Sequence, residues 1–231
     1  MLRVSSALIV TLATRSALAC PALPLVEEPV TPTGATIYDT GGVLMSTRPG
    51  GSGGQAAMPS GPQLRSGGTD VEVEAEYVAP ALSLLRPKQV LERTLELVDA
   101  QGTVLRSYEQ RAGGKPLGPP TGSAVSTLTR AAAVKARPPY PPQGTMTITL
   151  AQDPPADAAV LVVQTMRDRT GIAWAPVAAG QRTFAFEPAG KGCTPGPATA
   201  RQGARIVLVW FDIHGQRSAT STVITVGAAR R

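Results

Sequence analysis

Glycine and proline interrupt this chain so often that long helices have little room in it. The 231 residues include 24 glycines and 22 prolines, and turn-forming residues recur roughly every 8 to 12 positions. This spacing is typical of many short strands joined by turns, and the glycine and proline content is high for a helical enzyme. The sequence therefore predicts an all-β fold made of antiparallel β-sandwiches.

The clearest predicted strand is "VEVEAEYV", residues 71–78. Its apolar residues alternate with glutamates, which predicts one buried face and one solvated face. Three carboxylates in a row raise the idea of a metal or acid–base site, but a solvated strand face explains them more simply. The two faces are Val71, Val73, Ala75 and Tyr77 on one side and Glu72, Glu74 and Glu76 on the other.

Other segments of strand length follow the same pattern. Leu95 and Leu97, the turn 99–102 and residues 104–108 predict a hairpin, and Pro87 argues against a helix over 82–91. By contrast, residues 49–70 are rich in Gly, Ser and Pro and predict a mobile loop. Further strands are predicted within 35–39, 42–48, 123–136, 145–151, 158–168, 171–177, 182–188, 206–211 and 221–226.

Composition along the chain predicts two modules. Residues 1–19 form the signal segment discussed below, and residues 20–33 are a Pro-rich, extended lead-in. A first β-sandwich module is expected over 34–152, including the loop 49–70. A second, smaller module is expected over 153–228, because "AQDPPADAA" at 151–159 has the composition of a linker.

The end of the chain carries a resemblance to a known class of modules. A hydrophobic strand over 206–211 runs into Asp212-Ile213-His214-Gly215, then Arg-Ser-Ala and a closing Thr/Val strand. This ending resembles the last two strands of immunoglobulin-like or fibronectin type III-like modules of exported bacterial proteins, and "TPTGATI" at 31–37 resembles their start. The resemblance implies a β-sandwich, and it implies no function. About ten predicted strands would form either two such modules or one elaborated sandwich, and a bridge between Cys20 and Cys193 would place two modules side by side.

The first residues have the layout of a secretory signal. Arg3 precedes a short apolar run, and small residues at 17 and 19 stand before a cleavage point after Ala19. The run is too short and too polar for a membrane span. We therefore expect an exported protein of the periplasm or the extracellular space. The absence of Asn and the excess of Arg over Lys are associated with a bacterial source.

Cys20 would then be the first mature residue, and its alternatives are a disulfide, a lipid anchor and a free thiol. Cys20 and Cys193 are the only cysteines, and an even count in an exported chain favours a disulfide between them. A cysteine after small residues also resembles a lipoprotein signal, although such signals usually carry Leu where Ala17 stands. An outer-membrane lipoprotein anchored at Cys20 is therefore the second alternative.

Catalytic groups are scarce. His214 is the only histidine, so zinc sites with several imidazoles are excluded. Asp212, His214 and Ser218 (or Ser221) form a nominal hydrolytic group, but an exposed turn is a poor place for a triad. The pair Glu27-Glu28 would serve a glycosidase only if its carboxylates faced each other across a cleft.

These observations predict a non-catalytic protein that binds a protein or glycan of the cell envelope through sheet edges or loops. No cofactor or metal is expected, and nucleic acid is excluded as a partner because basic residues are scattered and aromatic residues are few. Trp174 and Trp210 are predicted to be core residues. A hydrolase using a carboxylate pair or Asp212, His214 and Ser218 is the alternative function.

Overall fold

The computed structural model describes residues 25–49, 62–89, 93–128, 144–186 and 202–228. Every regular element in these ranges is a β-strand, so the predicted all-β class is confirmed. The signal segment 1–19, Cys20 and Cys193 lie outside the described residues. No helix in the described ranges is long and apolar enough to cross a membrane.

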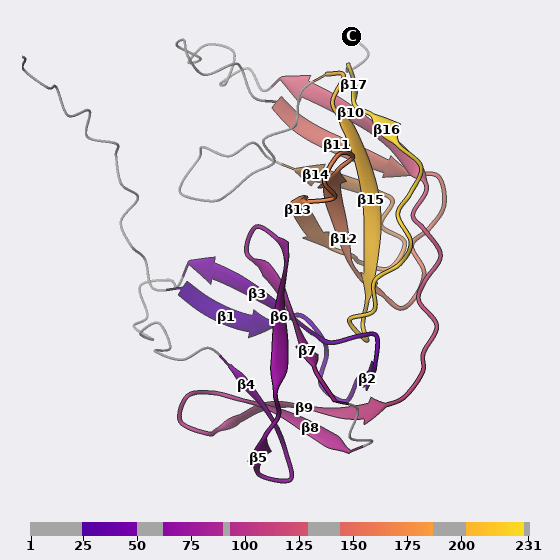
Figure 1. Ribbon diagram of the computed structural model, residues 1–231. Helices are drawn as coiled ribbons and strands as arrows, with labels where there is room; N and C mark the ends of the chain where they lie inside the picture. Colours follow the sequence, from indigo (N-terminus) through magenta and orange to yellow (C-terminus); the bar gives the residue numbers. More distant parts are fainter. Residues whose placement is uncertain (1–24, 50–61, 90–92, 129–143, 187–201, 229–231) are drawn as a thin grey trace, which may run out of the picture.

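Two sheets form the first sandwich (Figure 1). Their facing sides enclose an apolar core that includes Ile37, Met45, Leu97 and Tyr108. Sheet A has the order β1 (Leu25–Pro29), β3 (Val43–Pro49), β7 (Leu82–Pro87), β6 (Val73–Ala79). Sheet B has the order β2 (Thr36–Tyr38), β9 (Val104–Arg111), β8 (Thr94–Val98), β4 (Gln63–Ser66), β5 (Thr69–Asp70).

The second sandwich has two four-stranded sheets, and its core includes Ile148, Phe184, Leu161 and Trp210. Sheet C has the order β14 (Thr183–Phe186), β11 (Gly144–Leu150), β10 (Gly122–Leu128), β17 (Gly227–Ala228). Sheet D has the order β13 (Gly171–Pro176), β12 (Ala158–Thr165), β15 (Arg205–Asp212), β16 (Ile224–Thr225).

A third core joins the two sandwiches. The second face of sheet A packs on the second face of sheet D, which gives the layer order B, A, D, C. Figure 1 shows the hairpin of β6 and β7 reaching β13, which β6 contacts. We call this set the junction core; its members are Leu44, Val78, Ala79, Leu82, Leu84, Val160, Val162, Val209 and Phe211. Sheets A and D are therefore apolar on both faces where they meet.

The two sandwiches do not divide where the linker composition predicts. β10 and β11 pair with each other and with β17 and β14, so they belong to the second sandwich. The change from one sandwich to the other falls between β9 and β10, not near residues 151–159. The Pro-rich segment there is a turn between β11 and β12, because proline serves tight turns as well as linkers.

Two predicted irregular segments contain strands. Leu25–Pro29, within the expected lead-in, pairs with β3 as an edge strand, where proline is tolerated. Within the expected loop 49–70, β4 and β5 form a hairpin around Gly67-Gly68. Both glycines have positive φ, as a two-residue hairpin turn requires, and Leu64 is the buried apolar residue that anchors β4.

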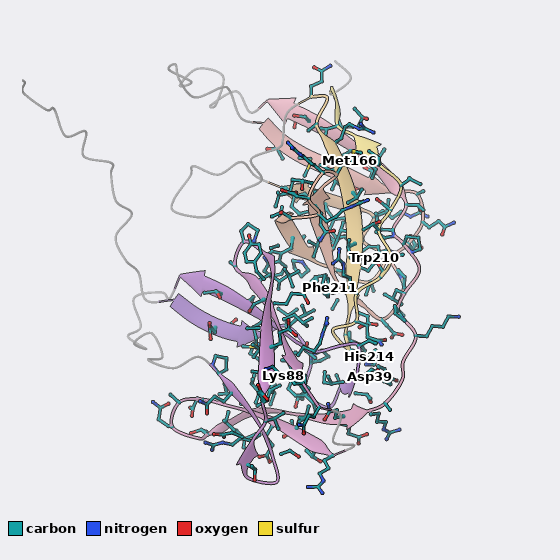
Figure 2. The ribbon with its side chains drawn as sticks, viewed as in Figure 1. Asp39, Lys88, Met166, Trp210, Phe211 and His214 are labelled. Atoms are coloured by element: carbon teal, nitrogen blue, oxygen red, sulfur yellow. The ribbon has the colours of Figure 1, made fainter. Side chains whose placement is uncertain are left out.

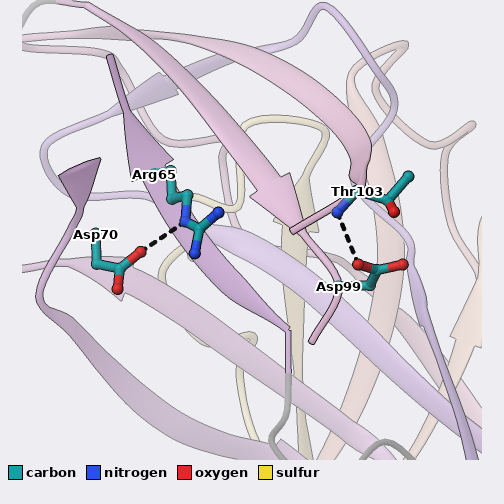
Figure 3. Close-up of polar contacts among 4 residues, drawn as sticks. All are labelled: Arg65, Asp70, Asp99 and Thr103. Atoms are coloured by element: carbon teal, nitrogen blue, oxygen red, sulfur yellow. Dashed lines mark hydrogen bonds and ion pairs between the residues drawn. The ribbon is translucent and has the colours of Figure 1, made fainter. Parts of the chain in front are cut away.

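The predicted hairpin of residues 94–108 is confirmed as β8 and β9. Its turn is held by the Asp99 side chain, which accepts hydrogen bonds from the amides of Gln101 at 2.9 Å and Thr103 at 2.8 Å. Figure 3 shows this turn near the ion pair between Arg65 Nε and Asp70 Oδ1, 2.7 Å long, which joins β4 to β5. These polar contacts lie at the edge of sheet B and have a structural role.

The last predicted strand is shorter than expected. β16 contains only Ile224 and Thr225, although residues 217–221 also run beside β15. Two serine side chains replace backbone hydrogen bonds that a regular strand would make to β15. Ser218 Oγ accepts from Trp210 N at 2.9 Å, and Ser221 Oγ accepts from Leu208 N at 2.8 Å. Side-chain oxygens satisfy these buried amides where a regular strand is missing.

Candidate functional site

His214 lies in the turn that follows β15, at the end of sheet D that meets the first sandwich (Figure 2). Its ring Nδ1 lies 2.8 Å from the carbonyl oxygen of Thr36 in β2, so Nδ1 carries the proton and donates. The ring also makes an edge contact with Tyr38, with centroids 5.1 Å apart. The single histidine therefore fastens one sandwich to the other.

The other residues of this turn also pack closely against the first sandwich. The amide of Gly42 donates to the carbonyl of His214 at 3.3 Å, and Gln216 Nε2 donates to Thr40 Oγ1 at 2.6 Å. Gly215 lies against the backbone of Gly42 so closely that a Cβ there would overlap the Gly42 carbonyl oxygen. We call this contact, residues 212–216 on residues 36–42, the junction turn.

The side chain of Asp212 stabilises the backbone conformation of the junction turn. It is 1% exposed, and its Oδ1 accepts from the amides of His214 at 2.9 Å and Gln216 at 2.8 Å. Burial raises the pKa of this carboxyl group, while the two amides and the charge of His214 oppose the rise. The Asp212 carboxylate binds two backbone amides of the turn, and it does not orient the imidazole of His214.

The structure does not assemble the hydrolytic group Asp212, His214 and Ser218. In a triad the base contacts the nucleophile and the acid orients the base. Here the Nδ1 of His214 binds a backbone carbonyl, and Ser218 Oγ lies between the amide of Trp210 and the carbonyl of Ala219. Ser221 Oγ is held in the same way, between Leu208 N and the Thr222 carbonyl.

The acidic residues considered for catalysis are also separated or paired. Glu27 and Glu28 are neighbours on β1, and neighbours on a strand point to opposite faces, so their carboxylates do not converge. In the glutamate row, Glu72 pairs with Lys88 and Glu76 pairs with Arg86 at 3.2 Å. Among the described residues no three His, Cys, Asp or Glu side chains gather as a metal site.

The two tryptophans differ in burial and in the core that they contact. Trp210 is buried in the second core, as predicted. Trp174 is half-buried beside the junction core, and its indole N–H donates to the Pro80 carbonyl at 3.0 Å. Trp174 therefore joins the sandwiches as well, and its ring is not a free platform for a ligand.

A pocket of about 230 Å³ opens at one end of the junction core. β6 supplies one wall with Glu76 and Tyr77, and the connection between β12 and β13 supplies another with Asp168 and Arg169. Arg217, beside β15, completes the lining. We call this the junction pocket, and both sandwiches contribute to it.

The junction pocket begins where the junction core becomes polar. Glu76 pairs with Leu84 across β6 and β7, so the two side chains share the face of sheet A that meets sheet D. On sheet D, Gln164 follows Val162 on the same face of β12. The same two strands thus supply apolar residues to the core and polar residues to the pocket.

The charged groups of the pocket differ in how well they are paired. Glu76 has its ion pair with Arg86, and Asp168 Oδ1 accepts from the hydroxyl of Thr165 and from the amide of Thr170 at 3.2 Å. These hydrogen bonds lower the pKa of Asp168, so it is ionised at neutral pH.

The two arginines have no such partners. Arg217 donates to Gln164 Oε1 at 3.0 Å, and Gln164 is only 4% exposed. Within the part of the chain that the structure describes, neither Arg169 nor Arg217 has a carboxylate within 4.0 Å. The pocket therefore presents guanidinium groups with unused donors.

Tyr77 is 62% exposed, and it pairs with Ser83, so its side chain lies on the opposite face of β6 from Glu76 and does not face sheet D. Alternation predicts Tyr77 on the buried face of its strand, but β6 is the edge of sheet A and the core does not reach this far. Arg169 and Arg217 were not singled out by their sequence context. Nothing local marks them, because the pocket forms only when β6 meets the turn after β12.

Comparisons with known proteins give distant likenesses. No protein-family model matches the chain, and no curated protein sequence matches it. Among solved structures, the chain is similar to the fibronectin(III)-like modules of Clostridium thermocellum CbhA, with a TM-score of 0.27, 11% identity, and coverage of 89% of this chain and 96% of that chain.

Two further structures are similar at the same level. One is the BSP domain of a biofilm associated protein, with a TM-score of 0.30, 12% identity, and coverage of 88% of this chain and 30% of that chain. The other is the CD2-binding domain of CD58, with a TM-score of 0.24, 11% identity, and coverage of 85% and 99%. The fold assignment rests on the sheets described above, because TM-scores this low support no argument of their own.

Proposed function

We propose that this chain is an exported, non-catalytic interaction protein of the cell envelope. Its two sandwiches act as one rigid body, and the junction pocket holds a protein or glycan partner. The observation that carries the proposal is the pocket itself, whose walls come from both sandwiches and are positioned by the junction core. Ligand sites often form at such domain interfaces.

The polar residues outside the pocket support a binding role over a hydrolytic one. Asp212, His214 and Ser218 are held by backbone groups, and each has a structural use at the junction turn or along β15. Arg169 has no comparable structural use, and exposed arginines are enriched where proteins bind partners.

The experiment is retention of cell-envelope fractions, both polysaccharide and protein, on the immobilised chain. We expect wild type to retain material that Arg169→Gly does not retain. Arg167→Ala is the matched control, because Arg167 is another exposed arginine of the connection between β12 and β13 and does not line the pocket. Equal retention by all three proteins would argue against the pocket as the binding site, and no retention would argue against the function.

Export and the role of Cys20 are part of the same proposal. We propose cleavage after Ala19 and a disulfide between Cys20 and Cys193. The intact mass of the protein from a secreting host distinguishes the alternatives. A disulfide makes the mature chain two hydrogens lighter before reduction than after it, whereas acyl chains on Cys20 add a mass that reduction does not remove.

A further inference from the structure

The junction pocket has a chemical character that narrows its ligand, and the inference below rests on the proposed binding function. Its carboxylates are already hydrogen-bonded or ion-paired, and no carboxylate among the described residues pairs with its guanidinium groups on Arg169 and Arg217. The unused binding capacity is therefore mainly cationic. Guanidinium groups bind carboxylates through paired N–H donors, which gives both strength and orientation.

Arg169 has a second unusual property. Its φ is +60°, a left-handed conformation that costs a side chain with a Cβ on the order of 1 kcal/mol or more. Glycine or asparagine would relieve the strain at this position. Strained residues concentrate at ligand sites, where the surrounding structure holds them in place. An arginine kept at this position of the pocket is consistent with a use for its charge.

The pocket also offers hydrogen-bond acceptors. Asp168 is ionised and uses only part of the acceptor capacity of a carboxylate, which has about four lone-pair sites. A ligand that brought only an anion would leave Asp168 facing a like charge. A ligand with both an anion and hydroxyl donors satisfies the two kinds of group together.

We propose that the junction pocket binds one carboxylate-bearing sugar unit, a uronic acid of a polysaccharide. The carboxylate lies against Arg169 and Arg217, and hydroxyl groups of the sugar donate to Asp168. The volume of about 230 Å³ is smaller than the roughly 300–1,000 Å³ of pockets for drug-sized ligands. It therefore suits one sugar ring, with the rest of the polymer outside.

The test is isothermal titration calorimetry of the full mature chain with trigalacturonic acid, maltotriose and a triglutamate peptide. Maltotriose has hydroxyls without a carboxylate, and triglutamate has carboxylates without a sugar. We expect trigalacturonic acid to bind at least tenfold more tightly than either. Absence of binding at millimolar concentrations, or equal binding of maltotriose or triglutamate, would overturn the proposal.

Two arginine variants locate the binding. Arg169→Gly removes the charge and suits the positive φ, so it leaves the fold intact, and we expect at least tenfold weaker binding of trigalacturonic acid. Arg167→Ala is the matched control, because Arg167 is an exposed arginine of the same connection that does not line the pocket. Equal weakening by both variants would indicate general charge attraction and overturn the pocket assignment.

This result is separable from the proposed function. If trigalacturonic acid fails while Arg169→Gly still abolishes retention of envelope material, the pocket binds a partner of another class and only the uronic acid assignment is lost. If trigalacturonic acid binds wild type and Arg167→Ala but not Arg169→Gly, both proposals are supported.

Discussion

At the scale of single residues, the groups that look reactive in the sequence serve the backbone. Asp212 and His214 hold the junction turn, and Ser218 and Ser221 bind amides of β15 that no strand reaches. Buried amides without partners cost free energy, so a hydroxyl at these two positions has a structural reason. The residues with unused binding capacity are Arg169 and Arg217, in the junction pocket.

Gly215 tests how tightly the sandwiches meet. Gly215→Ala places a Cβ on the Gly42 carbonyl at a φ of +67°. Gly180→Ala is the control, because Gly180 has a φ of +71° and a Cβ at this position would meet no atom within 4 Å. We expect Gly180→Ala to lower the free energy of unfolding by about 1 kcal/mol, and Gly215→Ala by roughly 2 kcal/mol more. Urea unfolding measures both, and equal losses would mean that the junction turn is not closely packed.

Asp212 predicts a specific pH dependence. Burial raises its pKa in the folded protein above the ordinary value of 3.8, while the amides of Gln216 and His214 and the charge of His214 oppose the rise; Asp157 adds to it. Below pH 3.8 both states are protonated and the folded state bears no penalty. As pH rises through the window above 3.8, the unfolded state loses its proton first, so the free energy of unfolding falls.

The comparison for this prediction is Asp212→Asn, which keeps an oxygen for the two amides. We expect the stability of wild type to fall relative to Asp212→Asn as pH rises from 3 toward 7. Urea unfolding at several pH values measures the difference. A rise of wild type relative to the variant over the same interval would contradict the assigned direction of the pKa shift.

At the scale of elements, β12 and β15 differ from strands of an isolated sandwich. Their burial is nearly continuous, because sheet D faces sheet C on one side and sheet A on the other. Val162 lies in the junction core and its neighbour Val163 lies in the second core. A strand of an isolated sandwich would have one of these two residues in water.

This double burial predicts that neighbouring residues are equally sensitive. We expect Val162→Ala and Val163→Ala each to lower the free energy of unfolding by about 2 kcal/mol, since both side chains are fully buried. Val104→Ala, on an exposed side chain, is expected to change it by less than about 0.5 kcal/mol. A neutral Val162→Ala, measured by chemical denaturation, would mean that sheets A and D do not pack together.

At the scale of the whole molecule, the junction core makes the two sandwiches interdependent. Leu44, Leu84, Val209 and Phe211 are buried only because the other sandwich covers them. Separating the sandwiches exposes this apolar surface to water, which costs free energy in proportion to its area. Such an interface favours unfolding in one step.

We therefore expect a single cooperative transition. Both tryptophans lie in the second sandwich, and Trp174 also contacts Pro80 of the first, so their fluorescence reports on that half and on the junction. Far-ultraviolet circular dichroism reports on all strands. The two signals should have the same denaturation midpoint in wild type. Leu84→Lys places a charge in the junction core and should separate the midpoints. Separate midpoints in wild type would contradict the shared core.

The sequence by itself determined the class of fold and most strand positions. Frequent Gly and Pro exclude long helices, and the alternation of apolar and polar residues identifies strands such as β8, β9 and β13. Both patterns can be read from the sequence because they depend only on residues that are neighbours along the chain. The apolar runs of β12 and β15 identify buried strands. Local pattern does not say what covers a second face, and it placed the sandwich boundary near residues 151–159 instead of between β9 and β10.

Only the tertiary structure decided how the sandwiches meet and where a ligand has room. The strand that contains Leu64 pairs with β8, and Leu25–Pro29 pairs with β3. Both partners are distant in sequence, so the local composition wrongly predicted irregular segments. His214 finds its partner Thr36 178 residues away, and Glu76 and Arg217 come together at the pocket although they are also far apart in the chain. The physical reason is that burial and pairing between distant segments depend on which sheet faces pack, and sheet packing is a property of the whole chain.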